Sequence, residues 1–218
     1  MWDHELKERL AEKRVIAVLV IDDVADAVPL AQSLLDGGVT AIELTLRTAV
    51  ALDALYAIRN EVPDMMAGVG TILRGDQLAA VKEAGAAFGV SPGFNPTIVK
   101  LASKIDFPFA PGIAIPGELE QAVELGCTVL KLFPAVPMGG LAYFKSMRGP
   151  YAHLGLSFIP LGGIDPSNMS DWLGTPGITA VGGSWIARRE LIADRNWSAI
   201  TENAHEAMRL AKNGGEVR

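Results

Sequence analysis

Short apolar runs alternate with helix-length amphipathic segments along most of this chain. The run at residues 14–21 is almost continuously apolar, which is typical of a strand buried on both faces. The segment after it carries Val24, Val28 and Ala31 at helical spacing and predicts an amphipathic helix. This succession recurs as far as a last helix at residues 197–210. The pattern predicts eight strands, at residues 14–21, 41–46, 66–70, 87–90, 107–111, 127–134, 156–161 and 178–181.

Capping residues stand at the joints between these runs. Asp22 and Asp23 follow the first predicted strand and Thr48 follows the second, and these side chains can accept a hydrogen bond from the first turn of a helix. Glycines such as Gly85 and Gly126 precede the next strand, where a left-handed residue would end a helix. These signals predict strand-helix units in which consecutive strands run parallel.

Eight such units predict a compact α/β fold, the (β/α)8 or TIM barrel, formed as a single domain by residues 1–218. A short N-terminal extension would precede the barrel and a C-terminal helix would close the chain. A doubly wound open sheet is the alternative, because periodicity alone does not separate the two architectures. The first strand is not followed by the G-x-G-x-x-G sequence of dinucleotide-binding sheets, which favours the barrel.

Charge and hydropathy restrict the partners of the chain. The net charge is −6 and no cluster of Lys and Arg is present, so we expect no nucleic acid and no anionic membrane as partner. No run approaches the ~20 apolar residues of a membrane span, and the charged start lacks a signal-peptide core. We therefore expect a cytoplasmic protein. The single cysteine, Cys127, has apolar neighbours and is expected to be a small buried hydrophobic residue.

Lys131 stands inside the apolar run at residues 127–134. A buried ammonium is costly unless it is paired or gives up its proton, and an unprotonated lysine forms Schiff bases with carbonyl compounds. We therefore hypothesise that Lys131 is a nucleophile. The alternative is a lysine whose stem is buried and whose charged head reaches solvent at the end of the strand.

Glu43 interrupts a second apolar run, and Arg47 follows it. Strand alternation places Glu43 on the same side as Arg47, and Lys131 on the same side as Phe133, so the acid and the amine can both face the barrel interior. A buried ion pair without chemistry is the alternative interpretation. Two ionisable groups inside a narrow barrel more often mark a site, which favours the functional interpretation.

Two glycine pairs, Gly162-Gly163 and Gly182-Gly183, directly follow the seventh and eighth predicted strands. In TIM barrels these loops commonly bind phosphate, because glycine lets backbone N–H groups approach the anion. Ser184 would add a hydroxyl group. Tight turns that need glycine for conformational reasons are the alternative.

Taken together, these features suggest Schiff-base chemistry on a phosphorylated keto acid, and the sequence resembles a known family. The resemblance extends from about Val15 to Trp185 and is to the 2-keto-3-deoxy-6-phosphogluconate (KDPG) / 4-hydroxy-2-oxoglutarate (KHG) aldolases. Its motifs are ELTLRT at residues 43–48, GVGT at 68–71, SPG at 91–93, PGI at 111–113, LKLFPA at 130–135, GGI at 162–164 and GGSW at 182–185.

The resemblance implies a class I aldolase that needs neither metal nor cofactor and that releases pyruvate and an aldehyde. It implies that Lys131 forms the Schiff base and that Glu43 is the general acid and base. Arg47 and Thr71 would hold the pyruvate carboxylate. The resemblance also implies a homotrimer. The remaining implied substrate contacts are Pro92 and Phe133, which would line the site, and Gly162, Gly163 and Ser184, which would hold the phosphate.

Three positions depart from the family pattern: Ile115 and Leu161 stand where threonine is frequent, and Val136 stands where glutamate is frequent. Lost hydrogen-bonding side chains can weaken selection between substrate stereoisomers, so the preferred sugar acid or hydroxy-oxoglutarate stays open. Two rival classes also stay open, a phosphate-binding barrel isomerase or epimerase and a non-catalytic sugar-phosphate binder. A metal-dependent aldolase is disfavoured, because none of the three histidines stands at a strand end.

Overall fold

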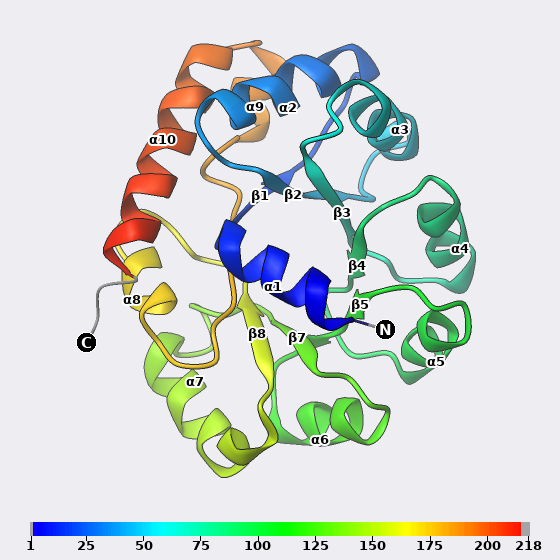
Figure 1. Cartoon of the computed structure of the whole chain (residues 1–218), viewed down its shortest axis with the longest axis vertical. Coiled ribbons are helices and arrows are strands. Elements are labelled where there is room, and N and C mark those ends of the chain that lie inside the picture. Colours follow the sequence, from blue (N-terminus) through cyan, green and yellow to red (C-terminus); the bar gives the residue numbers. More distant parts are fainter. Residues whose placement is uncertain (1, 215–218) are drawn as a thin grey trace.

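Parallel strands encircle the centre of the molecule, and most helices lie outside them (Figure 1). The computed structural model describes residues 2–214. Seven of the eight predicted strand segments contain a strand, and the eighth shares only Val181 with the last strand. Two short strands flank Pro111, at the end of the fifth segment, because proline has no N–H for the ladder. The strands are β1 (Val15–Leu19), β2 (Ala41–Thr45), β3 (Met66–Gly70), β4 (Phe88–Val90), β5 (Phe109–Ala110), β6 (Gly112–Ile113), β7 (Val129–Leu132), β8 (Ser157–Pro160) and β9 (Val181–Gly183).

Helices fill the segments between the strands. Nearly all the joints contain a helix, because apolar residues at helical spacing pack against the outer face of the sheet. The helices and 3-10 turns are α1 (His4–Lys13), η1 (Val24–Asp26), α2 (Ala27–Asp36), α3 (Ala51–Glu61), α4 (Gly75–Glu83), α5 (Pro96–Lys104), α6 (Pro116–Glu124), α7 (Gly140–Arg148), η2 (Gly149–Leu154), α8 (Met169–Leu173), α9 (Arg189–Ala193) and α10 (Trp197–Asn213).

The hydrogen-bonded strands form two parallel sheets, in the orders β5-β4-β3-β2-β1-β9 and β6-β7-β8. Chain continuity through Pro111 joins the sheets on one side, and a parallel bridge between Phe158 and Ile178 joins them on the other. The order follows the chain from β1 to β5 and returns the last strand to β1, unlike the 3-2-1-4-5-6 order of a doubly wound sheet. The prediction of an α/β fold with a curled parallel sheet is confirmed, while regular pairing is interrupted at the two junctions.

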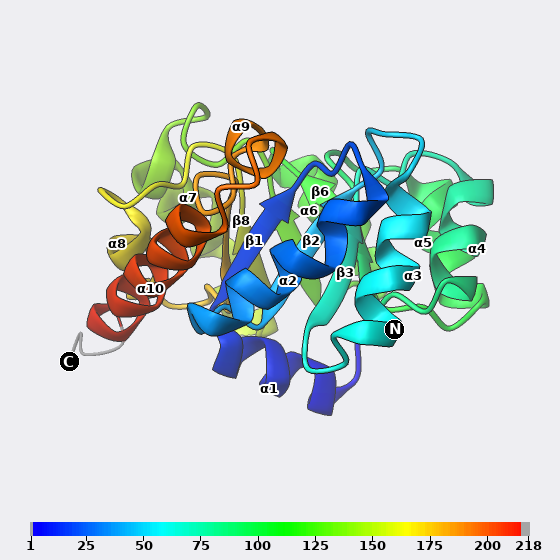
Figure 2. The same cartoon turned by 90° about the horizontal axis from the view of Figure 1, so that it is seen from above.

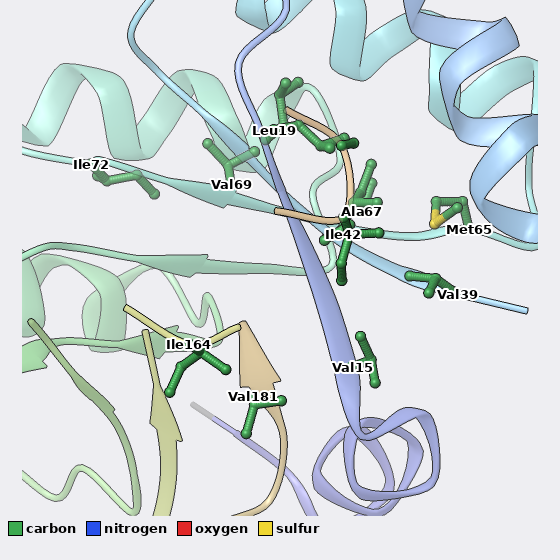
Figure 3. Packing of buried hydrophobic residues seen from close by; sticks show 14 of the residues in the cluster. Val15, Leu19, Val39, Ile42, Met65, Ala67, Val69, Ile72, Ile164 and Val181 are labelled. Carbon is green, nitrogen blue, oxygen red and sulfur yellow. The ribbon is translucent and has the colours of Figure 1, made fainter. Parts of the chain in front are cut away.

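Alternate residues of each strand enter two separate apolar layers. In β1, Val15 and Leu19 belong to the outer layer between strands and helices, whereas Ile16 and Val18 belong to an inner layer enclosed by the strands. Figure 3 shows outer-layer residues from β1, β2 and β3 packed together. Because β1 is buried on both faces, its sequence is continuously apolar.

Helix α1 covers the N-terminal ends of the strands, whereas α9 lies at their opposite end (Figure 2). Its first turn is capped by Asp3, whose side chain accepts a hydrogen bond from the Leu6 N–H at 2.7 Å. Leu6 and Leu10 are buried and join the inner layer, and the Trp2 ring lies 5.4 Å from that of Phe88. The expected N-terminal extension is therefore a helical plug of the inner core.

Several local expectations need correction. Thr48 does not cap a helix: α3 begins after Val50, and the Thr48 hydroxyl donates instead to the Ile21 carbonyl. The eighth strand, expected at residues 178–181, starts later and includes Gly182 and Gly183. Helix α5 was not expected from the sequence pattern at all.

Cys127 is buried as expected, and burial raises the pKa of its thiol to about 11. In the described part of the chain, none of the helices has the length and hydropathy needed to cross a membrane.

Candidate active site

A pocket of about 310 Å³ opens where the strands end. It collects residues from loops and strands that are far apart in the sequence, as the C-terminal face of a parallel α/β sheet commonly does. All nine site residues expected from the sequence line it: Glu43, Arg47, Thr71, Pro92, Lys131, Phe133, Gly162, Gly163 and Ser184. It is also lined by Leu161, Gly182 and Gly183, which were connected from the sequence with phosphate binding and substrate choice, and by Val18 and Ile164, which had not been assigned to the site.

Glu43 and Lys131 meet inside this pocket. The Lys131 Nζ atom donates to Glu43 Oε1 at 2.9 Å and to Oε2 at 3.2 Å. The two side chains are only 3% and 5% exposed, so the pair is shielded from water. Lys131 Nζ also lies 5.5 Å from the centre of the Phe133 ring, within reach of a cation–π contact. The alternative of a lysine head in solvent is therefore wrong.

Gly70 makes room for the Glu43 carboxylate. A Cβ atom at Gly70 would lie 1.9 Å from Glu43 Oε1, so no larger residue fits beside the acid as it stands. Two residues earlier in β3, a Cβ atom at Gly68 would lie 2.2 Å from the ring of Phe88. The GVG sequence therefore lets β3 pass close to the acid and to the inner core, a role that was not recognised from the sequence.

Arg47 and Thr71 stand beyond the ends of β2 and β3. Arg47 is exposed, and its guanidinium has no hydrogen bond or ion pair with residues 2–214. Thr71 has φ of 62°, which is uncommon for a β-branched residue and strained. Such strain is often found at functional sites, and here it occurs at a residue that lines the pocket.

The two glycine pairs differ in structure. Gly162 and Gly163 have φ of 89° and 83°, so this loop requires glycine. Gly182 and Gly183 lie in β9, where the missing side chains leave space for their neighbours. A Cβ at Gly182 would lie 2.6 Å from the Leu161 side chain, and one at Gly183 would lie 2.7 Å from Trp185 Nε1. The second pair is thus a close approach within a strand rather than a loop.

Of the three departures from the family pattern, only Leu161 lines the pocket. Ile115 is 51% exposed before α6, and Val136 packs behind the loop, 2.6 Å from the Cβ position of Gly163. Leu161 is 3% exposed, so it gives the pocket wall an apolar surface next to Gly182. Of these three positions, Leu161 is therefore the one whose side chain could contact a substrate in the pocket.

The ionisable and polar groups of the pocket define the ligand that it suits. Within residues 2–214, no three His, Cys, Asp or Glu side chains are grouped so that they could hold a metal ion. The pocket instead offers an amine, a carboxylate, a guanidinium and backbone N–H groups. Such a set suits an anionic carbonyl compound.

The family model described as KDPG and KHG aldolase matches residues 6–203. The chain belongs to this family. It is therefore an aldolase, a carbon–carbon lyase, and this assignment replaces the interpretations as an isomerase or a non-catalytic binder.

Named relatives agree with the assignment. The chain is 38% identical over 208 residues to the 2-dehydro-3-deoxy-phosphogluconate aldolase of Haemophilus influenzae, with 95% of this chain and 97% of the relative covered. It is 37% identical over 211 residues to the KHG/KDPG aldolase of Escherichia coli K12, with 97% and 98% covered.

Solved structures of the family share the fold. The KDPG aldolase of Legionella pneumophila, with pyruvate captured as a covalent carbinolamine intermediate, has a TM-score of 0.89 and 37% identity; 94% of this chain and 99% of that chain are covered. The Zymomonas mobilis aldolase with 3-phosphoglycerate has a TM-score of 0.83 and 38% identity, with 92% and 94% covered.

Proposed function

We propose that this aldolase cleaves KDPG, or a closely related 4-hydroxy-2-oxo acid, to pyruvate and an aldehyde by Schiff-base chemistry. The observation that carries the proposal is the buried pair of Lys131 and Glu43 in the pocket. An amine held against a carboxylate, away from water, suits imine formation with a keto group. The carbinolamine of pyruvate in the Legionella relative supports the same chemistry.

In the proposed mechanism, Glu43 accepts a proton from Lys131, and the free amine attacks the C2 carbonyl of the substrate. Glu43 then returns a proton to the carbinolamine hydroxyl, so that water leaves and a protonated imine forms. Glu43, again a carboxylate, accepts the proton of the C4 hydroxyl; the C3–C4 bond breaks, its electron pair passes to the imine nitrogen, and the aldehyde is released. The remaining enamine takes up a proton at C3, and hydrolysis frees pyruvate and Lys131.

Anion binding would orient the substrate at both ends. We assign the keto-acid carboxylate to Arg47 and Thr71, which line the pocket beyond β2 and β3. Gly162, Gly163 and Ser184 are the proposed contacts of a phosphate group. The left-handed glycine loop leaves the backbone open to an anion, which supports this assignment. Pro92 and Phe133, the remaining predicted contacts, would flank the reacting carbons.

Leu161 is the proposed determinant of substrate selection. An apolar side chain here cannot hydrogen-bond a substrate hydroxyl, so we expect weak discrimination between C4 epimers. Initial rates with KDPG, its galactonate epimer and 4-hydroxy-2-oxoglutarate test this expectation. A preference of 1,000-fold or more for one epimer would contradict it.

We further infer a complete single-domain (β/α)8 barrel, a homotrimer and a cytoplasmic location. The barrel and domain inference is supported by the inner layer, to which both sheets contribute, and by a family match that spans nearly the whole chain. The trimer rests on the family resemblance. Light scattering of the purified protein tests it, and a monomer would contradict it.

Trapping with borohydride tests the catalytic proposal. Pyruvate and sodium borohydride are added to the wild type, to Lys131→Arg and to the control Lys145→Arg, and the adduct is mapped by peptide mass. We expect labelling of Lys131 in the wild type and the control, and none in Lys131→Arg. Labelling at a different lysine, or no labelling of the wild type, would refute the mechanism.

A further inference from the structure

A second cavity, of about 300 Å³, adjoins the catalytic pocket. We call it the outer cavity. The two cavities share Val18, Arg47 and Ser184, so they adjoin at these residues. The outer cavity is also lined by Val20, Ala187, Arg188, Arg189 and Glu190.

Ion pairs fix one wall of the outer cavity. Arg189, at the start of α9, donates to both carboxylate oxygens of Asp22 at 2.7 and 2.6 Å. Arg195, just after α9, donates to Asp26 at 2.8 Å. Because hydrogen bonds from Arg189 hold the pKa of Asp22 below its ordinary value, this link between the β1 and β9 loops persists at neutral pH.

Two of the three arginines that line the outer cavity take no part in these ion pairs and are available to a ligand. Neither Arg47 nor Arg188 has a hydrogen bond or ion pair with the described residues, and both line the outer cavity. Glu190 offsets one positive charge, whereas the charge of Arg189 is already met by Asp22. The outer cavity therefore keeps a local positive character in a chain whose net charge is −6.

The proposed phosphate contacts lack a cation of their own. Gly162, Gly163 and Ser184 offer only N–H and hydroxyl groups to a dianion. Of the two cations in the catalytic pocket, Lys131 is paired with Glu43, and Arg47 is assigned to the carboxylate. Ser184 borders both cavities, so a phosphate beside it would face the outer cavity and its remaining arginine.

We propose that Arg188 binds the phosphate end of the substrate across the border at Ser184, and that the outer cavity is the entrance for anionic ligands. This assignment rests on the proposed function and deepens it, because it makes Arg188 a determinant of selectivity for phosphorylated substrates. A charge at the mouth of a pocket favours capture and binding of an anion but contributes little to the chemical step.

The reverse reaction, in which pyruvate and an aldehyde condense, distinguishes an effect on anion binding from an effect on the chemical step. Pyruvate is condensed with glyceraldehyde 3-phosphate or with glyceraldehyde, which differ only in the phosphate. In Arg188→Gln we expect KM for the phosphorylated aldehyde to rise about 10-fold, as is typical for the loss of one charge-assisted contact. We expect kcat, and KM for glyceraldehyde, to stay within about 2-fold of wild type, because the chemistry takes place at Lys131.

Arg74→Gln is the matched control. It removes the same charge from an exposed arginine beyond the end of β3, where Arg74 pairs with Asp76 and lines neither cavity. KM for glyceraldehyde 3-phosphate should be unchanged in this variant. An unchanged KM in Arg188→Gln, or an equal rise for both aldehydes, would overturn the proposal.

Calorimetric binding of inorganic phosphate is independent of turnover. Arg188→Gln should bind phosphate about 10-fold more weakly than the wild type and the Arg74→Gln control. Equal binding by all three proteins would overturn the role of Arg188. If the wild type binds phosphate through Arg188 but catalyses no condensation, the proposed function fails while the anion site stands.

Discussion

Replacing Gly70 with alanine perturbs the catalytic pair directly. The new Cβ atom would lie 1.9 Å from Glu43 Oε1, and ordinary contact begins at 3.4 Å, so the carboxylate must retreat by about 1.5 Å. Gly70 is not in the left-handed region, so its backbone accepts alanine. Gly70→Ala therefore tests the position of the acid without changing any functional side chain.

We expect Gly70→Ala to lose most of its kcat, because both hydrogen bonds between Lys131 and Glu43 are close to their optimal length. A retreat of this size stretches bonds of 2.9 and 3.2 Å beyond the hydrogen-bonding range. A displacement of about 1 Å at a reacting group can cost about 100-fold in rate, so we expect kcat to fall by at least about 100-fold. Crowding in a packed core should lower the free energy of unfolding by about 1–3 kcal/mol.

Coupled detection of released pyruvate gives kcat, and urea unfolding gives stability. Gly117→Ala is the control, because a Cβ at Gly117, in α6, meets no atom within 4 Å. It should retain wild-type kcat. If Gly70→Ala is folded and keeps kcat within 3-fold of wild type, the position of Glu43 does not limit the reaction, and the role proposed for the acid is wrong.

Three other variants probe separate parts of the molecule. Glu43→Gln should keep some borohydride-trapped adduct but lose most turnover, by about 100-fold or more, because an amide cannot shuttle the proton; unchanged turnover would remove Glu43 from the mechanism. Thr71→Gly relieves strained backbone at φ of 62°, so urea unfolding should show equal stability or a gain of up to about 1 kcal/mol while KM for pyruvate rises in condensation; a clear loss of stability would contradict the strain argument. Leu10→Ala removes fully buried apolar volume from the plug and should lower the free energy of unfolding by about 2–5 kcal/mol; a loss below 1 kcal/mol would mean that α1 packs loosely.

The strands could be predicted because their sequences are constrained on both faces. Burial between two layers explains the continuous apolar run of β1. It also makes Glu43 stand out as the charged residue in the buried strand β2. Strand alternation correctly placed Glu43 and Lys131 on facing sides, since a period of two leaves little freedom once one face is known. The pair was therefore accessible from sequence.

Neither the position of α1 nor the role of Gly70 could be predicted from strand alternation. Helix α1 buries only Leu6 and Leu10, so its apolar signal is weak, and its place depends on a hole that exists only after the strands curl. The signals for α5, by contrast, are present in the sequence, because Asn95 caps the helix and Pro96 is its first residue. Gly70 has a meaning only once Glu43 is known to point toward it.

Glycine serves different purposes in this site, and the difference affects how specificity could change. At Gly70 the missing side chain makes room for the carboxylate of Glu43, whereas at Gly182 it makes room for the apolar side chain of Leu161. Glu43 belongs to β2 and Leu161 follows β8, so the residue proposed to select the substrate and the acid proposed to act on it are held by different strands. Because the apolar side chain of Leu161 can neither form an imine nor transfer a proton, a change at Leu161 should alter the choice of sugar acid while the imine chemistry persists.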